Sequence, residues 1–365
     1  MKRKENKKQI MKRILILSLA ASLISFAGFS QNIDKAKLDA YFDALANNNI
    51  FMGSVAVYQN NELLYAKSVG FVDIEQGLKA NENSKYRIGS ISKTFTAVLV
   101  LKAIEENILN LNQTIDKFFP TIKNANKITI EQLLYHRSGI HCFTAKNWLR
   151  WNTQTKTEQE MIEMISKGGT DFKPDTKTRY SNSNFLLLSY ILERIYKKPY
   201  FEILEEKIIK SIGLKNTYYG KRINVEDNEC NSYKYKKGWK IESETDMSIP
   251  LGAGGIVSTP IDLTLFSEAL FSGKIVSKNS LEQMRNIKEN YGMGLYQMSF
   301  NDSTWLGHSG KIDGFIAMFA YFHDSNISFA FTTNGMNYNF WNVAIPILNA
   351  VFNKPFEIPK IKYTR

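Results

Sequence analysis

Apolar and polar residues repeat with two different periods along this chain. Residues 33–47 place apolar side chains at helical spacing. The runs 53–58 and 63–66 alternate like strands and flank an Asn-Asn pair, which is a common turn sequence. Helical patterns then dominate from residue 95 to about residue 212. The N-terminal part of the chain is therefore predicted to form a helix and a hairpin, followed by a long helical segment.

Strand patterns return near the end of the chain. Residues 315–322 and 327–333 are rich in apolar and aromatic side chains, a short polar turn separates them, and a last helix is expected over residues 340–352. Strands from both chain ends can form one antiparallel sheet flanked by the terminal helices. We expect an α/β (α+β) fold with a mainly helical lobe inserted at about residues 96–245, and a ligand cleft between the lobe and the sheet.

Composition and charge are typical of a globular enzyme. The 365 residues are 44% hydrophobic and 13% aromatic, which is enough to form a large core. The formal net charge is +12, but residues 2–13 alone hold seven basic side chains and one acidic side chain. A basic and aromatic cluster at residues 233–240 is not accompanied by a nucleic-acid-binding motif, so it is interpreted as a solvated loop. No nucleic acid partner is expected.

The N-terminus has the pattern of a secretory signal. A basic stretch precedes the mostly apolar residues 14–29, and small residues follow. We predict a Sec-type signal peptide over residues 1–30 and a mature hydrolase domain over residues 31–365, located in the periplasm or secreted, without stable membrane insertion. A retained anchor is the alternative, although the apolar stretch is short for a spanning helix. Met11 is a plausible second start site, because a complete signal follows it directly.

The cysteines and histidines do not indicate a metal site. Cys142 and Cys230 are the only cysteines, and the four histidines lack the spacing of a metal-binding helix. An oxidising compartment would allow a disulfide, but the sequence cannot show that the two thiols are within reach, and we expect them to be unpaired. No metal and no cofactor are expected.

Three short motifs carry the candidate chemistry: SISK at residues 90–93, YSN at residues 180–182 and HSG at residues 308–310. If residues 89–105 are helical, Ser90 and Lys93 lie on one face and can share a hydrogen bond, as a nucleophile and its base do. A lysine can serve as that base only if burial or a neighbouring charge lowers its pKa toward neutrality.

The second and third motifs supply groups suited to this chemistry. The Tyr180 phenol can pass on a proton, the Asn182 amide can donate a hydrogen bond to a substrate amide, and His308 offers a second titratable or cationic centre. Each residue also has a structural interpretation. The serine could cap a helix, the lysine could be solvated, the tyrosine could be a core aromatic, and the strand histidine could be a satisfied polar residue. His136 is expected to brace a loop by hydrogen bonding.

The order of these motifs and their flanking sequences resemble the penicillin-recognising serine hydrolases of the class C β-lactamase type. That group also includes D-alanyl-D-alanine carboxypeptidases, D-aminopeptidases and carboxylesterases. The resemblance covers roughly residues 33–353. Four further segments resemble family motifs, at residues 133–140, 212–217, 253–259 and 291–295. The resemblance implies a β-lactamase/transpeptidase-like fold.

The resemblance also implies roles for the site residues. Ser90 would be the acylated nucleophile, Lys93 its base, and Tyr180 the group that protonates the leaving atom. Asn182 would orient the substrate amide, and the backbone N–H groups of Ser90 and Lys311 would form the oxyanion hole. In the third motif, Ser309 and Gly310 would line the substrate, the glycine because it leaves room for close approach.

One residue departs from the class C β-lactamase pattern. His308 stands where those enzymes carry lysine, so a permanent charge is replaced by one that is only partly present at neutral pH. This change favours a D-alanyl-D-alanine carboxypeptidase-like enzyme or a D-amino-acid peptidase acting through an acyl-enzyme on Ser90. The alternatives are a carboxylesterase, a class C-like β-lactamase, or a penicillin-sensing module with little turnover. The expected partner is a small molecule or peptide: a peptidoglycan-type peptide, a β-lactam or an ester.

Overall fold

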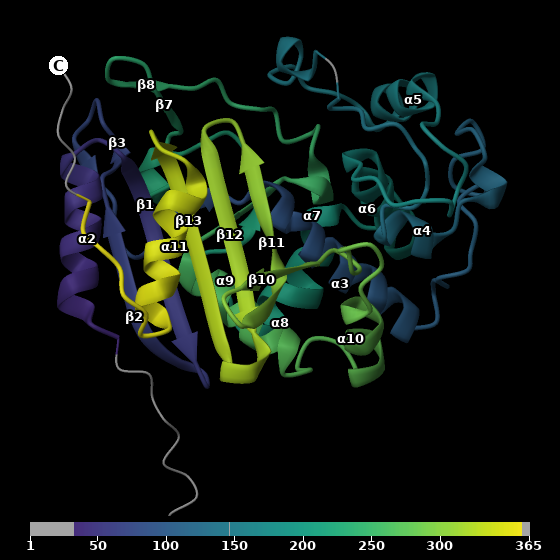
Figure 1. The fold of residues 1–365 in the computed structure, drawn as a ribbon. Coiled ribbons are helices and arrows are strands. Elements are labelled where there is room, and N and C mark those ends of the chain that lie inside the picture. The colour runs from purple at the N-terminus through teal and green to yellow at the C-terminus, as the bar shows by residue number, and fades with distance from the viewer. Residues whose placement is uncertain (1–32, 146, 360–365) are drawn as a thin grey trace, which may run out of the picture.

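An antiparallel sheet built from both ends of the chain is the centre of the molecule (Figure 1). The computed structural model describes residues 33–145 and 147–359. The main strand order is β10-β11-β12-β13-β1-β2. These strands are β1 (Phe51–Gln59), β2 (Glu62–Val69), β10 (Tyr296–Phe300), β11 (Ser303–Ile312), β12 (Phe315–Phe322) and β13 (Ile327–Met336). Because β1 pairs with β13, the sheet forms only when the two chain ends meet.

The predicted hairpin is present between β1 and β2. Its turn residues Asn60 and Asn61 have φ values of 52° and 64°. Asparagine tolerates this left-handed conformation, which two-residue hairpin turns require. The turn between β12 and β13 also lies where the sequence places it, over a 3-10 turn at His323–Ser325.

Helices cover both faces of the sheet. Figure 1 shows α2 (Lys35–Asn47) and α11 (Phe340–Val351) on one face, and α9 (Pro260–Phe271) behind the other. The first pair packs apolar side chains such as Phe42 and Ile347 against the sheet, in one continuous buried cluster. These side chains recur at helical spacing, which explains why the sequence pattern predicts both terminal helices.

The remaining α-helices lie mostly beside the sheet and enclose the larger apolar cluster. They are α3 (Ser92–Glu105), α4 (Ile130–Leu134), α5 (Glu158–Gly168), α6 (Asn182–Tyr196), α7 (Tyr200–Leu204), α8 (Lys210–Ile212) and α10 (Lys278–Arg285). Helix α3 is buried along almost its whole length. Because α3 is enclosed by the core on all sides, it can hold the groups at its N-terminal end in fixed positions.

Short strands and turns connect these parts. The strands are β3 (Phe71–Asp73), β4 (Leu78–Lys79), β5 (Tyr86–Arg87), β6 (Tyr218–Tyr219), β7 (Tyr233–Tyr235), β8 (Trp239–Ile241) and β9 (Ile256–Ser258). The other short helical turns are Gly89–Ile91, Ala125–Lys127, Trp148–Arg150, Glu205–Ile209, Val225–Asp227 and Leu251–Ala253. β5, β9 and β6 form a small second sheet. The stretch 96–245, expected to be mainly helical, thus also contains β6, β7 and β8. β6 pairs with β9 and β7 with β13, both outside this stretch, and β8 pairs with β7.

The predicted signal peptide, residues 1–30, lies outside the described residues. Within residues 33–145 and 147–359, no helix is both long enough and apolar enough to cross a membrane.

Candidate active site

Ser90 lies on a tight turn between the sheet and the helical region. The sequence predicts a helix over residues 89–105, but a 3-10 turn at Gly89–Ile91 precedes α3. The α-helix does not include Gly89 because this residue has φ 51°, outside the helical region, and a Cβ there would lie 2.8 Å from the backbone nitrogen of Lys311. A side chain fits neither that conformation nor that space.

The Ser90 turn is in direct backbone contact with strand β11. A Cβ on Gly310 would lie 1.9 Å from the carbonyl oxygen of Ile88 and 2.9 Å from the backbone nitrogen of Ser90. The two backbones can approach this closely only because glycine stands on each side of the contact. This approach brings the backbone nitrogens of Ser90 and Lys311 to the same place, although they are distant in the sequence.

Lys93 is the immediate partner of Ser90. Its Nζ lies 3.0 Å from Ser90 Oγ and donates a hydrogen bond to the carbonyl of Ala253 at 2.6 Å. The lysine is 0% exposed, and burial lowers the pKa of its amine to about 7. A large fraction of this amine is therefore unprotonated near neutral pH, as a base requires.

Tyr180 contacts the same hydroxyl from another side. Its phenol donates a hydrogen bond to Ser90 Oγ at 2.7 Å, and its ring centroid lies 4.9 Å from Lys93 Nζ. Burial raises the pKa of Tyr180 well above that of an ordinary phenol. The group therefore keeps its proton at neutral pH and can donate it.

His308 is buried on β11, and its charge differs from the expectation. Burial, and then the nearby charge of Lys93, lower the pKa of His308 to about 3. Its Nδ1 lies 2.5 Å from the carbonyl oxygen of Ser309, to which it donates. The sequence predicts a partial positive charge on His308 at neutral pH, and this prediction is wrong. The sequence alone does not show that the imidazole is buried away from solvent and lies near the charge of Lys93.

Asn182 begins helix α6 and faces Ser90 across a cavity. Its Nδ2 donates to Thr144 Oγ1 at 2.9 Å, and its backbone N–H donates to Cys142 Sγ at 3.3 Å. One N–H of the amide expected to donate to substrate is thus engaged by Thr144, a residue that the sequence did not single out.

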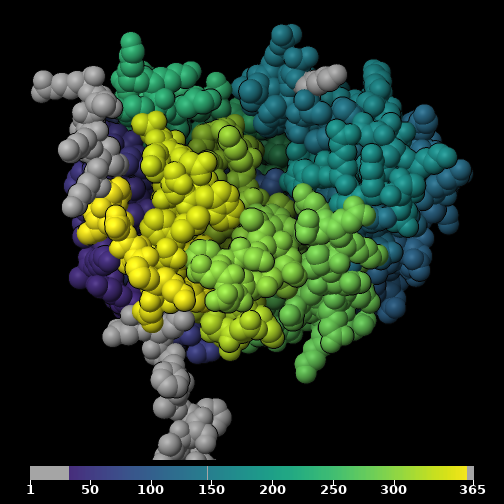
Figure 2. All heavy atoms as spheres, in the orientation of Figure 1, coloured from purple at the N-terminus to yellow at the C-terminus, as the bar shows by residue number. Residues whose placement is uncertain are grey.

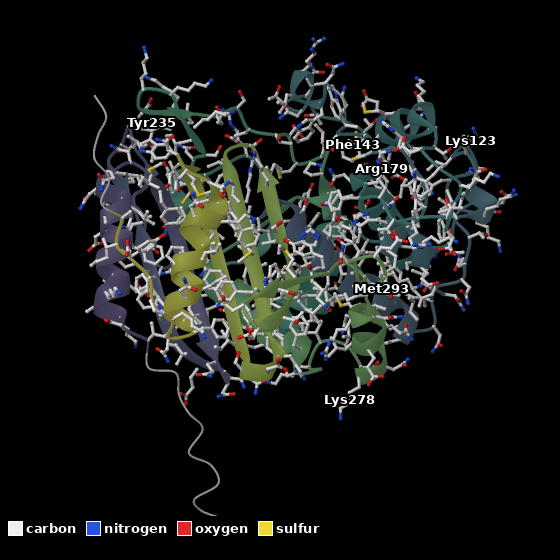
Figure 3. All side chains as sticks on the ribbon, in the orientation of Figure 1. Lys123, Phe143, Arg179, Tyr235, Lys278 and Met293 are labelled. Carbon is white, nitrogen blue, oxygen red and sulfur yellow. The ribbon has the colours of Figure 1, made fainter. Side chains whose placement is uncertain are left out.

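Two cavities flank Ser90. The first, of about 540 Å³, lies toward the helical region and is lined by Asn182, Phe143 and Trp148 among others. The second, of about 470 Å³, is lined by Tyr180, His308, Ser309 and Gly310, and by the aromatic residues Tyr291, Tyr296, Phe340 and Trp341. Ser90 and Lys311 line both cavities. Figure 2 shows the surface hollowed where the C-terminal strands meet the teal helical segment, and Figure 3 shows Phe143 on the helical side.

The structure thus brings all eight predicted site residues to one place, and it adds several that sequence reasoning missed. The carbonyl of Ala253 and the ring of Tyr291 lie in segments that resemble family motifs, so a signal for them existed. Thr144, Tyr296 and Trp341 had none, because only the folded chain brings them near Ser90.

His136 acts as the expected brace. It is buried with φ 57°, and its Nδ1 accepts a hydrogen bond from the backbone N–H of Ser181 at 3.2 Å. Its ring centroid lies 4.5 Å from that of Tyr180. Burial lowers the pKa of His136 well below its ordinary value, so a neutral imidazole supports the YSN motif.

An ion-pair cluster holds the two segments that meet at Ser90, the strand before the Ser90 turn and the end of β11. Arg87 donates to Asp313 at 2.9 Å and to Glu244 at 2.9 Å. Asp313 also accepts from the backbone N–H and the hydroxyl of Thr245. Because Arg87 precedes the Ser90 turn and Asp313 follows Lys311, this cluster fixes both partners of the backbone contact.

The cysteines and the acidic groups suggest no other chemistry. Cys142 and Cys230 are both free. Within the part of the chain that the structure describes, no cluster of three or more histidine, cysteine, aspartate or glutamate side chains is placed to hold a metal ion.

Comparison with known proteins identifies the family. The model of the family described as Beta-lactamase matches residues 38–349. The chain belongs to the Beta-lactamase family. The match spans most of the described residues, and it confirms both the resemblance and the fold class inferred from the sequence.

Relatives within and around this family carry related names. A teichoic acid D-alanine hydrolase of Staphylococcus aureus is 29% identical over 247 residues, which is 66% of this chain and 60% of that protein. The chain thus spans only about 60% of the length of this relative. A D-amino acid amidase of Ochrobactrum anthropi SV3, solved with L-phenylalanine amide, has a TM-score of 0.77 at 23% identity and covers 87% of this chain and 99% of its own.

A D-stereospecific amidohydrolase of a Streptomyces species gives a TM-score of 0.72 at 25% identity, covering 87% of this chain and 98% of its own. These relatives are hydrolases and amidases by name. They support the predicted enzyme class of the chain, a serine hydrolase of the Beta-lactamase family.

Proposed function

We propose that this protein is an exported serine hydrolase that transfers a D-aminoacyl group from an ester, amide or peptide to Ser90 and then to water. The observation that carries the proposal is the pair of contacts at Ser90 Oγ. Lys93 Nζ lies 3.0 Å away and Tyr180 Oη lies 2.7 Å away. A base and a proton donor at one hydroxyl provide what an acyl transfer needs.

The acylation step follows from these contacts. The unprotonated fraction of Lys93 takes the proton of Ser90 as its Oγ attacks the substrate carbonyl. Tyr180, which keeps its proton, passes one to the leaving oxygen or nitrogen. The bond to the leaving group then breaks, and the acyl group remains on Ser90. Lys93 restores the proton of the phenol within the same cluster.

The oxyanion formed in this step needs hydrogen-bond donors. The backbone N–H groups of Ser90 and Lys311 are the proposed donors, since the Ser90 turn and β11 touch at this point. Loss of one such donor costs about 3 kcal/mol of transition-state stabilisation in other hydrolases.

The two cavities support a substrate with two parts. Tyr180, the proposed proton donor to the leaving group, lines the second cavity, whereas Asn182 lines the first. The leaving group therefore belongs in the aromatic second cavity and the acyl group in the first. A D-aminoacyl group is proposed because two of the relatives are named for D-alanine or D-amino acid compounds, and a third is named D-stereospecific.

Export rests on the sequence of residues 1–30, so the periplasmic or secreted location remains part of the proposal. Mass spectrometry of the exported chain would test it. A mature protein beginning at Gln31 would support the proposal, and a chain retaining these residues in the cytoplasm would contradict it.

The proposed activity is tested by mass spectrometry of the intact mature protein. Wild type, Ser90→Ala and the control Ser299→Ala, which removes an exposed hydroxyl of β10, are mixed with a D-alanyl ester, D-phenylalanine amide or a fluorescent penicillin. We expect an acyl adduct and product release with the D-aminoacyl compounds in wild type and Ser299→Ala, and neither in Ser90→Ala. Equal turnover by Ser90→Ala would overturn the mechanism. A penicillin adduct without turnover of any D-aminoacyl compound would select the sensing module instead.

A further inference from the structure

A closed chain of hydrogen bonds holds the side chain of Asn182. Its Nδ2 donates to Thr144 Oγ1 at 2.9 Å, and Thr144 Oγ1 lies 3.2 Å from Cys142 Sγ. The same sulfur accepts the backbone N–H of Asn182 at 3.3 Å. Whichever of the thiol and the hydroxyl donates between them, the threonine oxygen accepts from the amide nitrogen of Asn182. The chain therefore returns to Asn182 and holds its amide nitrogen toward Thr144.

This orientation decides what Asn182 offers to a ligand. A carboxamide carries two N–H donors on nitrogen and an acceptor oxygen on the other side. Because the nitrogen is turned toward Thr144, the carbonyl oxygen is left for the cavity that both residues line. Among the residues that the structure describes, this oxygen has no hydrogen-bond partner. Asn182 thus presents an acceptor to the cavity, in addition to the second N–H of its amide, which is the kind of donor that the sequence interpretation assigned to it.

The carboxylates that line the first cavity are already paired. Asp313 is paired with Arg87 at 2.9 Å, and Glu242 lies 3.4 Å from Lys234. The carbonyl of Ala253 accepts from Lys93. Neither these carboxylates nor this carbonyl is left free, whereas Asn182 Oδ1 lies on a residue whose amide nitrogen is already held by Thr144.

We propose that Asn182 Oδ1, held in place by Thr144, accepts a hydrogen bond from the protonated α-amine of the acyl group, so that this side of the cavity is an amine subsite. The inference rests on the proposed function, because an α-amine lies one carbon from the scissile carbonyl of any aminoacyl substrate. A hydrogen bond from a charged donor is stronger than one between neutral groups. The subsite selects free aminoacyl compounds over acyl groups that lack the amine.

Thr144 is a positioning residue in this proposal, and it offers a matched pair of variants. Thr144→Val keeps the shape of the side chain and removes the oxygen, whereas Thr144→Ser keeps the oxygen. The substrates are a D-alanyl ester and a propionyl ester of the same alcohol, which differ only in the amine. The readout is the ratio of their kcat/KM values, with kcat and KM measured separately.

We expect wild type to prefer the D-alanyl ester. Thr144→Val should reduce that preference about tenfold, which equals about 1.4 kcal/mol, mainly through KM for the D-alanyl ester. Thr144→Ser should retain the preference, and the melting temperatures of both variants should match that of wild type.

Two outcomes would overturn the amine subsite while leaving the proposed function intact. In the first, Thr144→Val lowers kcat/KM for both esters by the same factor, as expected if Thr144 only supports the structure. In the second, wild type shows no preference for the D-alanyl ester. In both cases an acyl adduct on Ser90 still forms. If wild type hydrolyses neither ester and forms no adduct, the proposed function fails together with the subsite.

Discussion

The amine of Lys93 lies 3.0 Å from the hydroxyl of Ser90, yet the lysine side chain is completely buried. The sequence spacing brings these two groups together, but the burial comes from the rest of the fold. Loss of solvent disfavours the ammonium form and lowers the pKa of Lys93 to about 7. The helical core around α3 therefore sets the reactivity of this lysine.

The pH dependence of acylation should report this pKa. We expect kcat/KM for the propionyl ester, whose acyl group has no amine to titrate, to rise as the pH passes through about 7 and then level off, because only the unprotonated lysine can accept the serine proton. Tyr180 should not lower kcat/KM below pH 9, since burial raises its pKa. His308 should not change charge above pH 5, since its pKa is about 3, and should add no further limb to the profile there. The measurement is a pH–rate profile from pH 5 to 9. If His308→Gln keeps the rise of kcat/KM near pH 7, the rise belongs to Lys93. If the variant loses the rise, the assignment to Lys93 is contradicted.

Removal of the buried amine should stabilise the fold while abolishing acylation. Between pH 7 and pH 10.5 the unfolded lysine binds a proton that the folded lysine has lost, so wild-type stability rises with pH in that window. Lys93→Met removes the free-energy cost of keeping the amine buried and deprotonated. We expect the variant to be more stable than wild type by roughly 2–4 kcal/mol at pH 7, since each unit of pKa shift equals about 1.4 kcal/mol.

Urea unfolding at pH 7 and pH 10 measures this difference. The extra stability of Lys93→Met over wild type should be smaller at pH 10 than at pH 7. The exposed control Lys117→Met should have the wild-type free energy of unfolding at both pH values. A variant less stable than wild type at both pH values would show that the hydrogen bonds of Lys93 outweigh its desolvation.

Local signals were sufficient for much of the fold and for the centre of the site. Asn60 and Asn61 mark a hairpin because the turn itself demands their conformation. Ser90, Lys93 and Tyr180 stand in motifs whose order indicates one chemistry, and the fold brings them together.

Properties that depend on distant partners could not be predicted in the same way. The neutrality of His308 depends on burial beneath other elements and on the charge of Lys93. Likewise, the contact of Thr144 with Asn182 depends on how the loop before α5 packs against α6. Neither dependence leaves a local pattern, so only the folded chain reveals them.

The close approach at Gly310 should not tolerate a methyl group. A Cβ there would lie 1.9 Å from the carbonyl oxygen of Ile88, and neither backbone can yield without separating β11 from the Ser90 turn. We expect Gly310→Ala to reduce kcat/KM at least about a hundredfold, because both oxyanion donors move. The fold should lose roughly 1–3 kcal/mol.

A control glycine lies at the end of α5. A Cβ on Gly168 would approach no atom closer than 3.4 Å, so Gly168→Ala should leave kcat/KM unchanged. Full activity of Gly310→Ala would show that the backbone contact is not needed for catalysis.

The buried ion pair beside the site should be required for stability. Arg87→Met leaves Asp313, whose side chain is 1% exposed, without its cation. Removing one partner of such a pair typically destabilises a protein by about 3–5 kcal/mol, because the other charge stays buried. The double variant Arg87→Met, Asp313→Leu should recover part of that loss. Thermal unfolding measures both, and Lys198→Met, at an exposed pair with Glu206, should leave the melting temperature unchanged. An equal loss of stability in the single and double variants would mean that Arg87 acts through its hydrogen bonds to the backbone carbonyls of Thr245 and Lys221 instead.

The aromatic cavity should determine the choice of leaving group. Trp341 begins the last helix and lines this cavity together with Tyr180, the proposed proton donor. A flat aromatic leaving group can pack against the indole, and such contacts contribute roughly 1 kcal/mol. We expect Trp341→Ala to lower kcat/KM about fivefold to tenfold for a D-alanyl aryl ester and little for the methyl ester. Comparing the two esters separates a contact with the leaving group from damage to the site, which would affect both. If the variant instead discriminates between acyl groups while treating the two alcohols alike, the assignment of the two cavities must be reversed.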